Sequence, residues 1–199
     1  MKSPHLVLVV GCGSIGERHV RTFLATGRTR IIACDQRLSV REHISKRYGV
    51  SVVADWNVVV ADPTLTGIVV ATPASSHLEI ALRSLDSGRH VLIEKPLALG
   101  LDGTDRLVAA RDRSRAFGAV AYVRHCLPPL REAREFIERG EFGAVRHVTI
   151  ATGEHFPTAR PAYRDIYYRD HAQGGGAIQD ALTHMANAVE WILGPTTRV

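Results

Sequence analysis

Three glycines with the spacing Gly-x-Gly-x-x-Gly lie near the start of the chain, at Gly11, Gly13 and Gly16. Between a strand and a helix, such a loop binds the pyrophosphate of a dinucleotide. Its glycines allow a tight turn, a close approach of the phosphates and close packing of the helix. The free N–H groups at the helix start, at Ser14 and Ile15, then face the anion. The spacing alone is weak evidence, because glycines also mark ordinary turns.

An acidic residue follows at a distance that suits a nicotinamide cofactor. Asp35 lies nineteen residues after Gly16, at the end of a short apolar run. A carboxylate at this place binds the ribose hydroxyls and repels a 2′-phosphate, so it favours NAD over NADP. Arg37 lies close by and softens this preference, which keeps NADP possible. The alternative for Asp35 is a strand-ending residue that caps the next helix.

Two other apolar runs end in segments that suit chemistry. The first is Ala-Thr-Pro-Ala-Ser-Ser-His at residues 71–77, and the second is Ile-Glu-Lys-Pro-Leu at residues 93–97. Ligands of doubly wound sheets bind outside the carboxyl ends of the strands. A lysine held there, partly removed from water, suits proton transfer, and Lys95 has this place. A lone Glu-Lys-Pro also fits a surface turn.

The last helix expected from the sequence has two different faces. At about 100° per residue, an apolar stripe faces one way and is typical of core: Ile178, Leu182, Met185, Val189 and Ile192. The opposite face carries Asp180, His184, Asn187 and Trp191. Asp180 and His184 are four residues apart, so their side chains are neighbours on a helix. A triple glycine at residues 174–176 allows close approach to a ligand, although a solvated face explains the polar stripe equally well.

The elements that must position these residues follow from the hydrophobic pattern. Short runs rich in Val and Ile predict buried strands at residues 6–10, 30–34, 67–71 and 90–93. Mixed stretches between and after them predict helices at residues 15–26, 40–48, 76–87 and 102–115, with Ser76 and Glu79 as a capping box. Continuous apolar strands that alternate with helices predict a doubly wound parallel α/β sheet.

The pattern changes near residue 122, which predicts one domain at residues 1–122 and another at 123–199. In the second part we expect a helix at residues 130–140, a strand at 145–152, an irregular stretch at 156–170 and the final helix. A further short strand, at 118–123, precedes them. An isolated strand does not make a stable sheet. We therefore expect the chain to be a truncated form of a longer protein.

Composition narrows the possible classes of protein. Hydrophobic residues make up 45% of the 199 residues and charged residues 23%, as in soluble globular proteins. No apolar run approaches the roughly 18 residues of a membrane helix, and no signal peptide is recognisable, which predicts a cytoplasmic protein without membrane contact. The net charge of +5 comes from scattered arginines, which does not indicate nucleic-acid binding. Three separate cysteines predict small buried thiols and no metal site.

Together, these motifs resemble the glucose–fructose oxidoreductase / inositol dehydrogenase / rhizopine-catabolism family of NAD(P)-dependent oxidoreductases. The glycine loop, Ala-Thr-Pro-x-x-x-His, Glu-Lys-Pro-Leu and Gly-Gly-Gly-x-x-x-Asp-x-x-x-His occur in family order between residues 5 and 194. The resemblance implies a Rossmann domain followed by the start of an α+β domain with an open, mostly antiparallel sheet. It also implies that the full-length form is a homo-oligomer.

The resemblance further implies hydride transfer between the nicotinamide and a hydroxyl-bearing carbon of a sugar, sugar derivative or cyclitol. His184 would accept the hydroxyl proton, Asp180 would orient it, and Lys95 would stabilise the oxygen. Four further residues would contact the cofactor, with Thr72, Pro73 and His77 at the nicotinamide and Glu94 at the ribose.

The residues that contact the substrate are not fixed by these motifs. Tyr163, Arg164 and Tyr167 are candidates for contacts with substrate hydroxyl or carboxylate groups, and simple loop packing is the alternative. The rival hypothesis for the whole chain is a non-catalytic NAD(P)-binding sensor, or a truncated remnant without a complete substrate domain.

Overall fold

The structure, a computed structural model, describes residues 4–153, 170–176 and 178–198. The chain divides into two compact units, Met1–Ala121 and Tyr122–Val199. No helix among the described residues has both the length and the apolar character that crossing a membrane requires.

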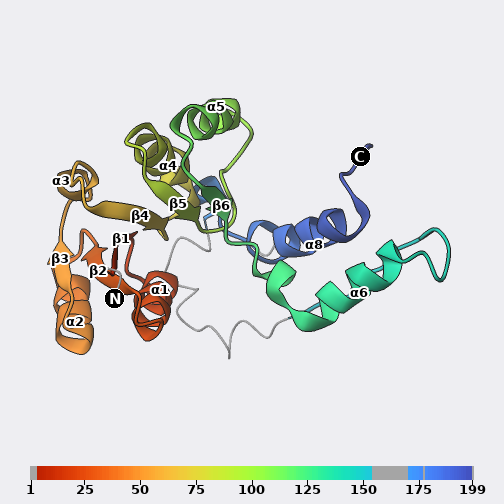
Figure 1. Cartoon of the computed structure of the whole chain (residues 1–199), viewed down its shortest axis with the longest axis horizontal. Helices are drawn as coiled ribbons and strands as arrows, with labels where there is room; N and C mark the ends of the chain where they lie inside the picture. Colours follow the sequence, from red (N-terminus) through yellow and green to blue (C-terminus); the bar gives the residue numbers. More distant parts are fainter. Residues whose placement is uncertain (1–3, 154–169, 177, 199) are drawn as a thin grey trace. The chain divides into compact units, whose positions relative to one another are not determined.

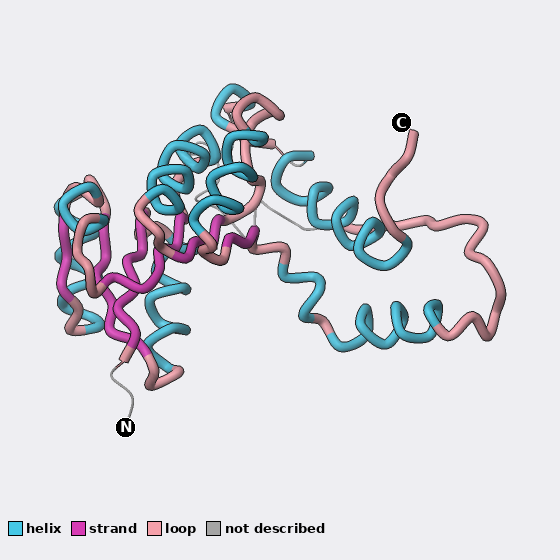
Figure 2. The backbone as a smooth tube through the Cα atoms, turned by 45° about the horizontal axis from the view of Figure 1, so that its top comes forward, coloured by secondary structure: helices cyan, strands magenta, loops and turns pink. Residues whose placement is uncertain are grey.

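The first unit is built on one parallel sheet of six strands (Figures 1 and 2). The strands are β1 (His5–Val10), β2 (Thr29–Cys34), β3 (Ser51–Val53), β4 (Leu65–Val70), β5 (His90–Ile93) and β6 (Gly118–Val120). Their order is β3-β2-β1-β4-β5-β6, and each neighbouring pair is parallel. The order reverses between β1 and β4, which defines the switch point where doubly wound sheets bind ligands. The predicted fold class is confirmed.

Helices cover both faces of this sheet (Figure 1). They are α1 (Ser14–Ala25), α2 (Leu38–Tyr48), α3 (Asn57–Val60), α4 (His77–Asp86) and α5 (Thr104–Ser114). One core layer holds Ile80 of α4 and Leu107 of α5, and the other holds Val20 of α1 and Ile44 of α2. The two layers lie on opposite faces of the sheet.

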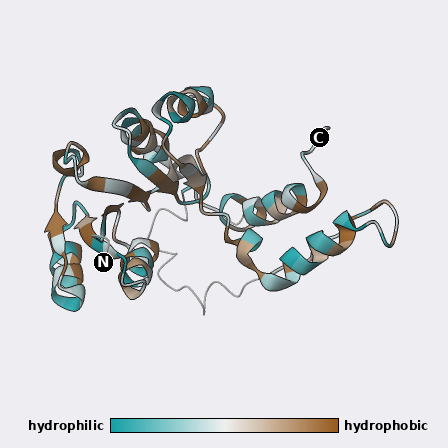
Figure 3. Cartoon of the chain, viewed as in Figure 1, coloured by the Kyte–Doolittle hydropathy of each residue, from teal (hydrophilic) through white to brown (hydrophobic). Residues whose placement is uncertain are grey.

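Strand β1 shows why the apolar runs are continuous. Its residues alternate between the two layers, with Leu6, Leu8 and Val10 in one layer and Val7 and Val9 in the other. Leu8 and Val9 are both fully buried. A fully buried Leu or Val side chain contributes about 1.5–3 kcal/mol, so both faces of β1 stabilise the unit. Figure 3 shows this apolar character in the strands, while the helices carry both apolar and polar residues.

Two details of the first unit differ from the sequence prediction. The short elements β3 and α3 were not predicted, because three or four residues are too few to show a period. The capping box is wrong, since the Ser76 side chain makes no cap bond to α4. Its hydroxyl lies 2.7 Å from Thr72 Oγ1 and 2.9 Å from the Pro73 carbonyl oxygen. Ser76 ends the 3-10 turn η1 (Ala74–Ser76), and there its hydroxyl bonds back into the preceding loop.

The regular secondary structure described in the second unit is helical. It contains η2 (Val123–Cys126), α6 (Pro128–Glu138), η5 (His171–Gln173), the π-helical turn η6 (Ile178–Leu182) and α8 (Thr183–Leu193). Proline at the start of α6 suits the first helical turn, where its missing N–H leaves no bond unmade.

Three predictions for the second unit are wrong. Residues 145–152 form no strand, because no other strand lies among the described residues of this unit to pair with them. Ile178 and Leu182 of the expected core stripe are 67% and 53% exposed, because no second layer among the described residues covers them. Cys126 is exposed at the end of η2, whereas Cys12 and Cys34 are buried as predicted.

Candidate functional site

The glycine loop connects β1 to α1, and two of its glycines are required by packing. Gly11 has a φ of +84°, and a Cβ there would lie 2.7 Å from the Ala71 carbonyl oxygen. A Cβ at Gly16 would collide with the Gly11 carbonyl. Only glycine therefore lets the loop close against the switch point between β1 and β4.

Gly13 is different, because its surroundings are open. A Cβ at Gly13 would meet only Arg37 Nη2, at 4.0 Å. Gly13 is the N-cap of α1, and no side chain caps this end of the helix. The amides of Ser14 and Ile15 in the first turn are therefore available to an anion that approaches across Gly13.

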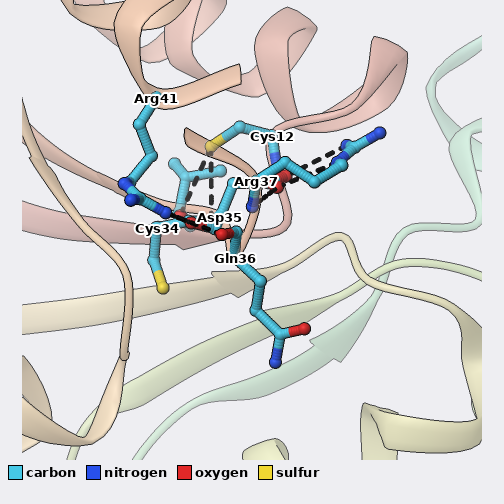
Figure 4. A network of polar contacts seen from close by, with 7 residues as sticks. Cys12, Cys34, Asp35, Gln36, Arg37 and Arg41 are labelled. Carbon is cyan, nitrogen blue, oxygen red and sulfur yellow. Dashed lines mark hydrogen bonds and ion pairs between the residues drawn. The ribbon is translucent and has the colours of Figure 1, made fainter. Parts of the chain in front are cut away.

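Asp35 lies at the end of β2 beside this loop (Figure 4). Only 8% of it is exposed, and its Oδ2 accepts a hydrogen bond of 3.0 Å from the Cys12 N–H. Burial raises the pKa of Asp35, but hydrogen bonds from Arg37 and Cys12 outweigh burial and hold the pKa below its usual value. The residue is thus a carboxylate anchored to the glycine loop. The N-cap of α2 is Arg37, and no side chain caps that helix, so the helix-capping alternative does not describe Asp35.

Two arginines lie beside this carboxylate (Figure 4). Arg37 donates from its side chain to both oxygens of Asp35, and its own side chain is 64% exposed. Arg41 donates from Nη1 to the backbone carbonyls of Asp35 and Gln36, at 2.7 and 2.8 Å. Positive charge is therefore available where a 2′-phosphate would need it.

The loops after β4 and β5 are tied together by His77. This residue is 1% exposed, and its ring nitrogens lie 2.9 Å from the Pro96 carbonyl oxygen and 2.8 Å from the Thr72 carbonyl oxygen. The ring therefore holds together the two strand ends that carry Thr72 and Lys95. The peptide bond between Lys95 and Pro96 is cis.

Glu94 follows β5 and has a partner that the sequence analysis missed. Its Oε1 lies 2.7 Å from His19 Nε2, and its Oε2 accepts a hydrogen bond of 3.2 Å from the Lys95 N–H. Burial raises the pKa of Glu94, but the hydrogen bond and charge of His19, together with Lys95, lower it overall. One signal points to His19: it lies three residues after Gly16, on the same face of α1.

The polar face of the last helix is partly covered within the second unit. The Trp191 ring stacks on His125 at 4.7 Å between ring centroids, and the Arg134 guanidinium lies 4.8 Å from its centroid. His184 meets Tyr122 edge to face at 6.0 Å. A purely solvated face is thereby excluded. No sequence pattern pointed to these three covering residues, because they lie more than fifty positions away in the chain.

Two polar atoms, one on this face and one on the ring stacked against it, lack partners among the described residues. His125 Nε2 and Asn187 Oδ1 are buried and have no hydrogen-bond partner among the described residues. Buried polar atoms normally have one, and the hydroxyl of a ligand would supply it. Asp180 lies in η6, where its N–H donates to the Gly176 carbonyl at 3.0 Å.

Lys95 belongs to the first unit, whereas Asp180 and His184 belong to the second. Tyr163, Arg164 and Tyr167 lie outside the described residues. Within the described ranges, no three His, Cys, Asp or Glu side chains gather as a metal site would need.

The sheet order, the glycine loop and the anchored acid define a Rossmann-type dinucleotide-binding protein. Residues 5–122 match the model of the GFO/IDH/MocA oxidoreductase family with its NAD-binding Rossmann fold, and residues 130–199 match the GFO/IDH/MocA C-terminal domain. The chain belongs to this oxidoreductase family, which confirms the resemblance.

Several characterised proteins are similar to this chain. Inositol 2-dehydrogenase of Ralstonia nicotianae is 28% identical over 94% of the chain and 53% of its own length. Levoglucosan dehydrogenase of Pseudarthrobacter phenanthrenivorans is 22% identical over 96% of the chain and 52% of its own length. The chain thus spans about half the length of these relatives.

Solved structures show the same fold. WlbA dehydrogenase from Bordetella pertussis, in complex with NADH and UDP-GlcNAcA, has a TM-score of 0.86 at 24% identity and covers 98% of this chain and 57% of its own. GenD2 from gentamicin A biosynthesis, in complex with NAD, has a TM-score of 0.81 at 28% identity, with coverages of 98% and 55%.

Proposed function

We propose that this protein is an NAD(P)-dependent dehydrogenase that transfers a hydride between nicotinamide and a hydroxyl-bearing carbon of a sugar, sugar derivative or cyclitol. The anchored carboxylate of Asp35, beside the open space at Gly13, carries the proposal. Names of relatives such as inositol 2-dehydrogenase and levoglucosan dehydrogenase support the substrate class. In this proposal residues 1–122 bind the cofactor and residues 123–199 contribute to substrate binding, in a cytoplasmic protein.

The residues of the first unit fit a dinucleotide. The amides of Ser14 and Ile15 would bind the pyrophosphate, and Asp35 would accept hydrogen bonds from the ribose hydroxyls, which favours NAD. Arg37 keeps NADP possible. Thr72 and Pro73 would lie at the nicotinamide, whose C4 accepts the hydride when the cofactor is bound.

Three residues would carry the proton chemistry. His184 would take the proton from the substrate hydroxyl as the hydride leaves the same carbon. Asp180 would orient this hydroxyl. Lys95 would donate a hydrogen bond to the oxygen and stabilise its developing negative charge.

This proposal is tested by cofactor binding and turnover. We expect NADH to bind and a panel of sugars and cyclitols to include a substrate. Replacing Lys95 or His184 should lower turnover at least about 100-fold, with NADH affinity retained. Lys46→Met and His43→Gln are matched controls, because both residues are exposed on α2. Unchanged turnover in the Lys95 and His184 variants would refute the site.

A second candidate function is a nucleotide-binding sensor without catalysis. It is favoured by one observation, the lack of any strand among the described residues of the second unit. NADH binding without turnover on any member of the panel would favour this candidate.

A further inference from the structure

A largely buried His–Glu pair in the first unit lies outside the three residues proposed to carry the proton chemistry. His19 is on α1, the helix that begins at the glycine loop, and Glu94 follows β5. Their side chains meet at 2.7 Å between Nε2 and Oε1, and each is only 16% exposed. The carboxylate accepts, so the imidazole N–H is the donor in this bond.

The backbone around Lys95 is held on both sides. Before Lys95, the Oε2 of Glu94 accepts the Lys95 N–H at 3.2 Å. After it, the ring of His77 lies 2.9 Å from the carbonyl oxygen of Pro96. The backbone N–H of Glu94 itself donates to the Val70 carbonyl at 2.8 Å, which fixes the segment to the end of β4.

Among these contacts, the bond from His19 decides where the Glu94 carboxylate points. With one oxygen bound to His19, the other is directed at the Lys95 N–H. Without His19, a mostly buried carboxylate would lose its charge-assisted bond and turn toward water. The Lys95 N–H would then lose its acceptor.

We propose that His19 is a positioning residue that holds Glu94, and through Glu94 the backbone of Lys95, against the helix of the glycine loop. The inference rests on the proposed function for the role of Lys95, which it deepens. It links the place where the pyrophosphate would bind to the place where the substrate oxygen would be held.

The chain offers a matched control for this pair. His43 of α2 lies 3.4 Å from Glu17 of α1, so the residue types are the same. The His43 side chain is 52% exposed, and the other described polar partners of Glu17 are Arg47 and Tyr48 of α2, which are remote from Lys95 in the chain. Removing His43 therefore tests loss of a histidine from the same domain without loss of the contact to Glu94.

The test uses the backbone amide of Lys95 directly. The chain has three lysines, Lys2, Lys46 and Lys95, so selective ¹⁵N-lysine labelling gives three amide signals in an NMR spectrum. The Lys95 signal is assigned by its loss in K95R. In H19A we expect this signal to shift and its hydrogen exchange to accelerate at least about fivefold, as for a lost hydrogen bond. H19Q, which keeps an N–H donor, should restore both, and H43A should leave both unchanged.

The outcomes are separable from those of the proposed function, because the measurement needs neither cofactor nor substrate. An unchanged Lys95 signal in folded H19A, or a failure of H19Q to restore it, would overturn the inference. If H19A does not fold, E94A removes the acceptor directly and should give the same change at Lys95. An unchanged Lys95 signal in E94A would also overturn it. Absence of turnover would contradict only the proposed dehydrogenase activity.

Discussion

Arg37 donates to both carboxylate oxygens of Asp35, from Nε at 3.1 Å and from Nη2 at 3.2 Å. The acid is buried beside the glycine loop, whereas the arginine is 64% exposed. The guanidinium is therefore free to move toward solvent, while the carboxylate is fixed. In the proposed function, this asymmetry would let one site prefer NAD and still accommodate a 2′-phosphate.

The first prediction concerns the carboxylate. Asp35→Asn keeps the shape and an acceptor for the Cys12 N–H but removes the charge that we propose to bind the ribose hydroxyls. We expect NADH affinity to fall roughly tenfold, the usual effect of losing a hydrogen bond to a charged group, and NADPH affinity to fall less. Fluorescence titration with both cofactors measures this. Asp62→Asn, at an exposed turn with Thr64, is the control. A wild type that already prefers NADPH would contradict our interpretation of Asp35.

The second prediction concerns the arginine. Arg37→Ala removes the cation next to Asp35, so the carboxylate repels a 2′-phosphate without compensation. NADPH affinity should fall about tenfold or more, and NADH affinity should stay the same or increase. Arg106→Ala, an exposed arginine on α5, serves as the control in the same titrations. Equal losses for both cofactors would show that Arg37 does not discriminate between them.

The third prediction separates the glycines of the loop. Gly16→Ala should lower the free energy of unfolding by about 1–3 kcal/mol, the usual cost of overpacking, because its Cβ meets the Gly11 carbonyl. Gly13→Ala should leave stability within about 0.5 kcal/mol, since its surroundings are open. It should nevertheless weaken NADH binding, because the added Cβ occupies the approach of the pyrophosphate. Urea denaturation of both variants measures the change in stability, and NADH titration measures the change in affinity. Full NADH affinity in the Gly13→Ala variant would show that the pyrophosphate binds elsewhere.

The fourth prediction concerns the thiols. Burial, followed by the nearby charge of Asp35, raises the pKa of Cys12 to about 12. Burial likewise raises the pKa of Cys34 to about 11. A thiol reacts as the thiolate, so neither should react at neutral pH. A disulfide reagent should label one thiol of the native protein, Cys126, and three after denaturation. Rapid labelling of native Cys126→Ser would disprove this.

The fifth prediction is a pH dependence of stability. The pKa of Glu94 is lower in the folded protein than its model-peptide value of 4.5. The ionised group therefore stabilises the fold above pH 4.5, and this contribution is lost as the pH falls through the lowered pKa. Glu94→Gln should reduce the free energy of unfolding near pH 7 and have a smaller effect in acid. Urea denaturation at several pH values measures the difference, and a constant difference would contradict it.

Much of the first unit could be predicted from the sequence because its signals are local. The continuous apolar runs indicate strands that are buried on both faces, and β1 is buried on both of its faces. The glycine spacing indicates a tight turn, and part of its steric demand is local, because a Cβ at Gly16 would collide with the Gly11 carbonyl. The second unit was predicted less well, since a strand at residues 145–152 needs a partner that no local pattern supplies.

By itself, the sequence determined the doubly wound sheet, the glycine loop and the acid after β2, because period, glycine spacing and strand ends are properties of neighbouring residues. Only the tertiary structure decided that His19 binds Glu94, seventy-five positions away, and that His77 joins the two strand ends. The physical reason is that side-chain partners are set by the order in which the strands lie side by side, β3-β2-β1-β4-β5-β6, which places residues together that are remote in the chain.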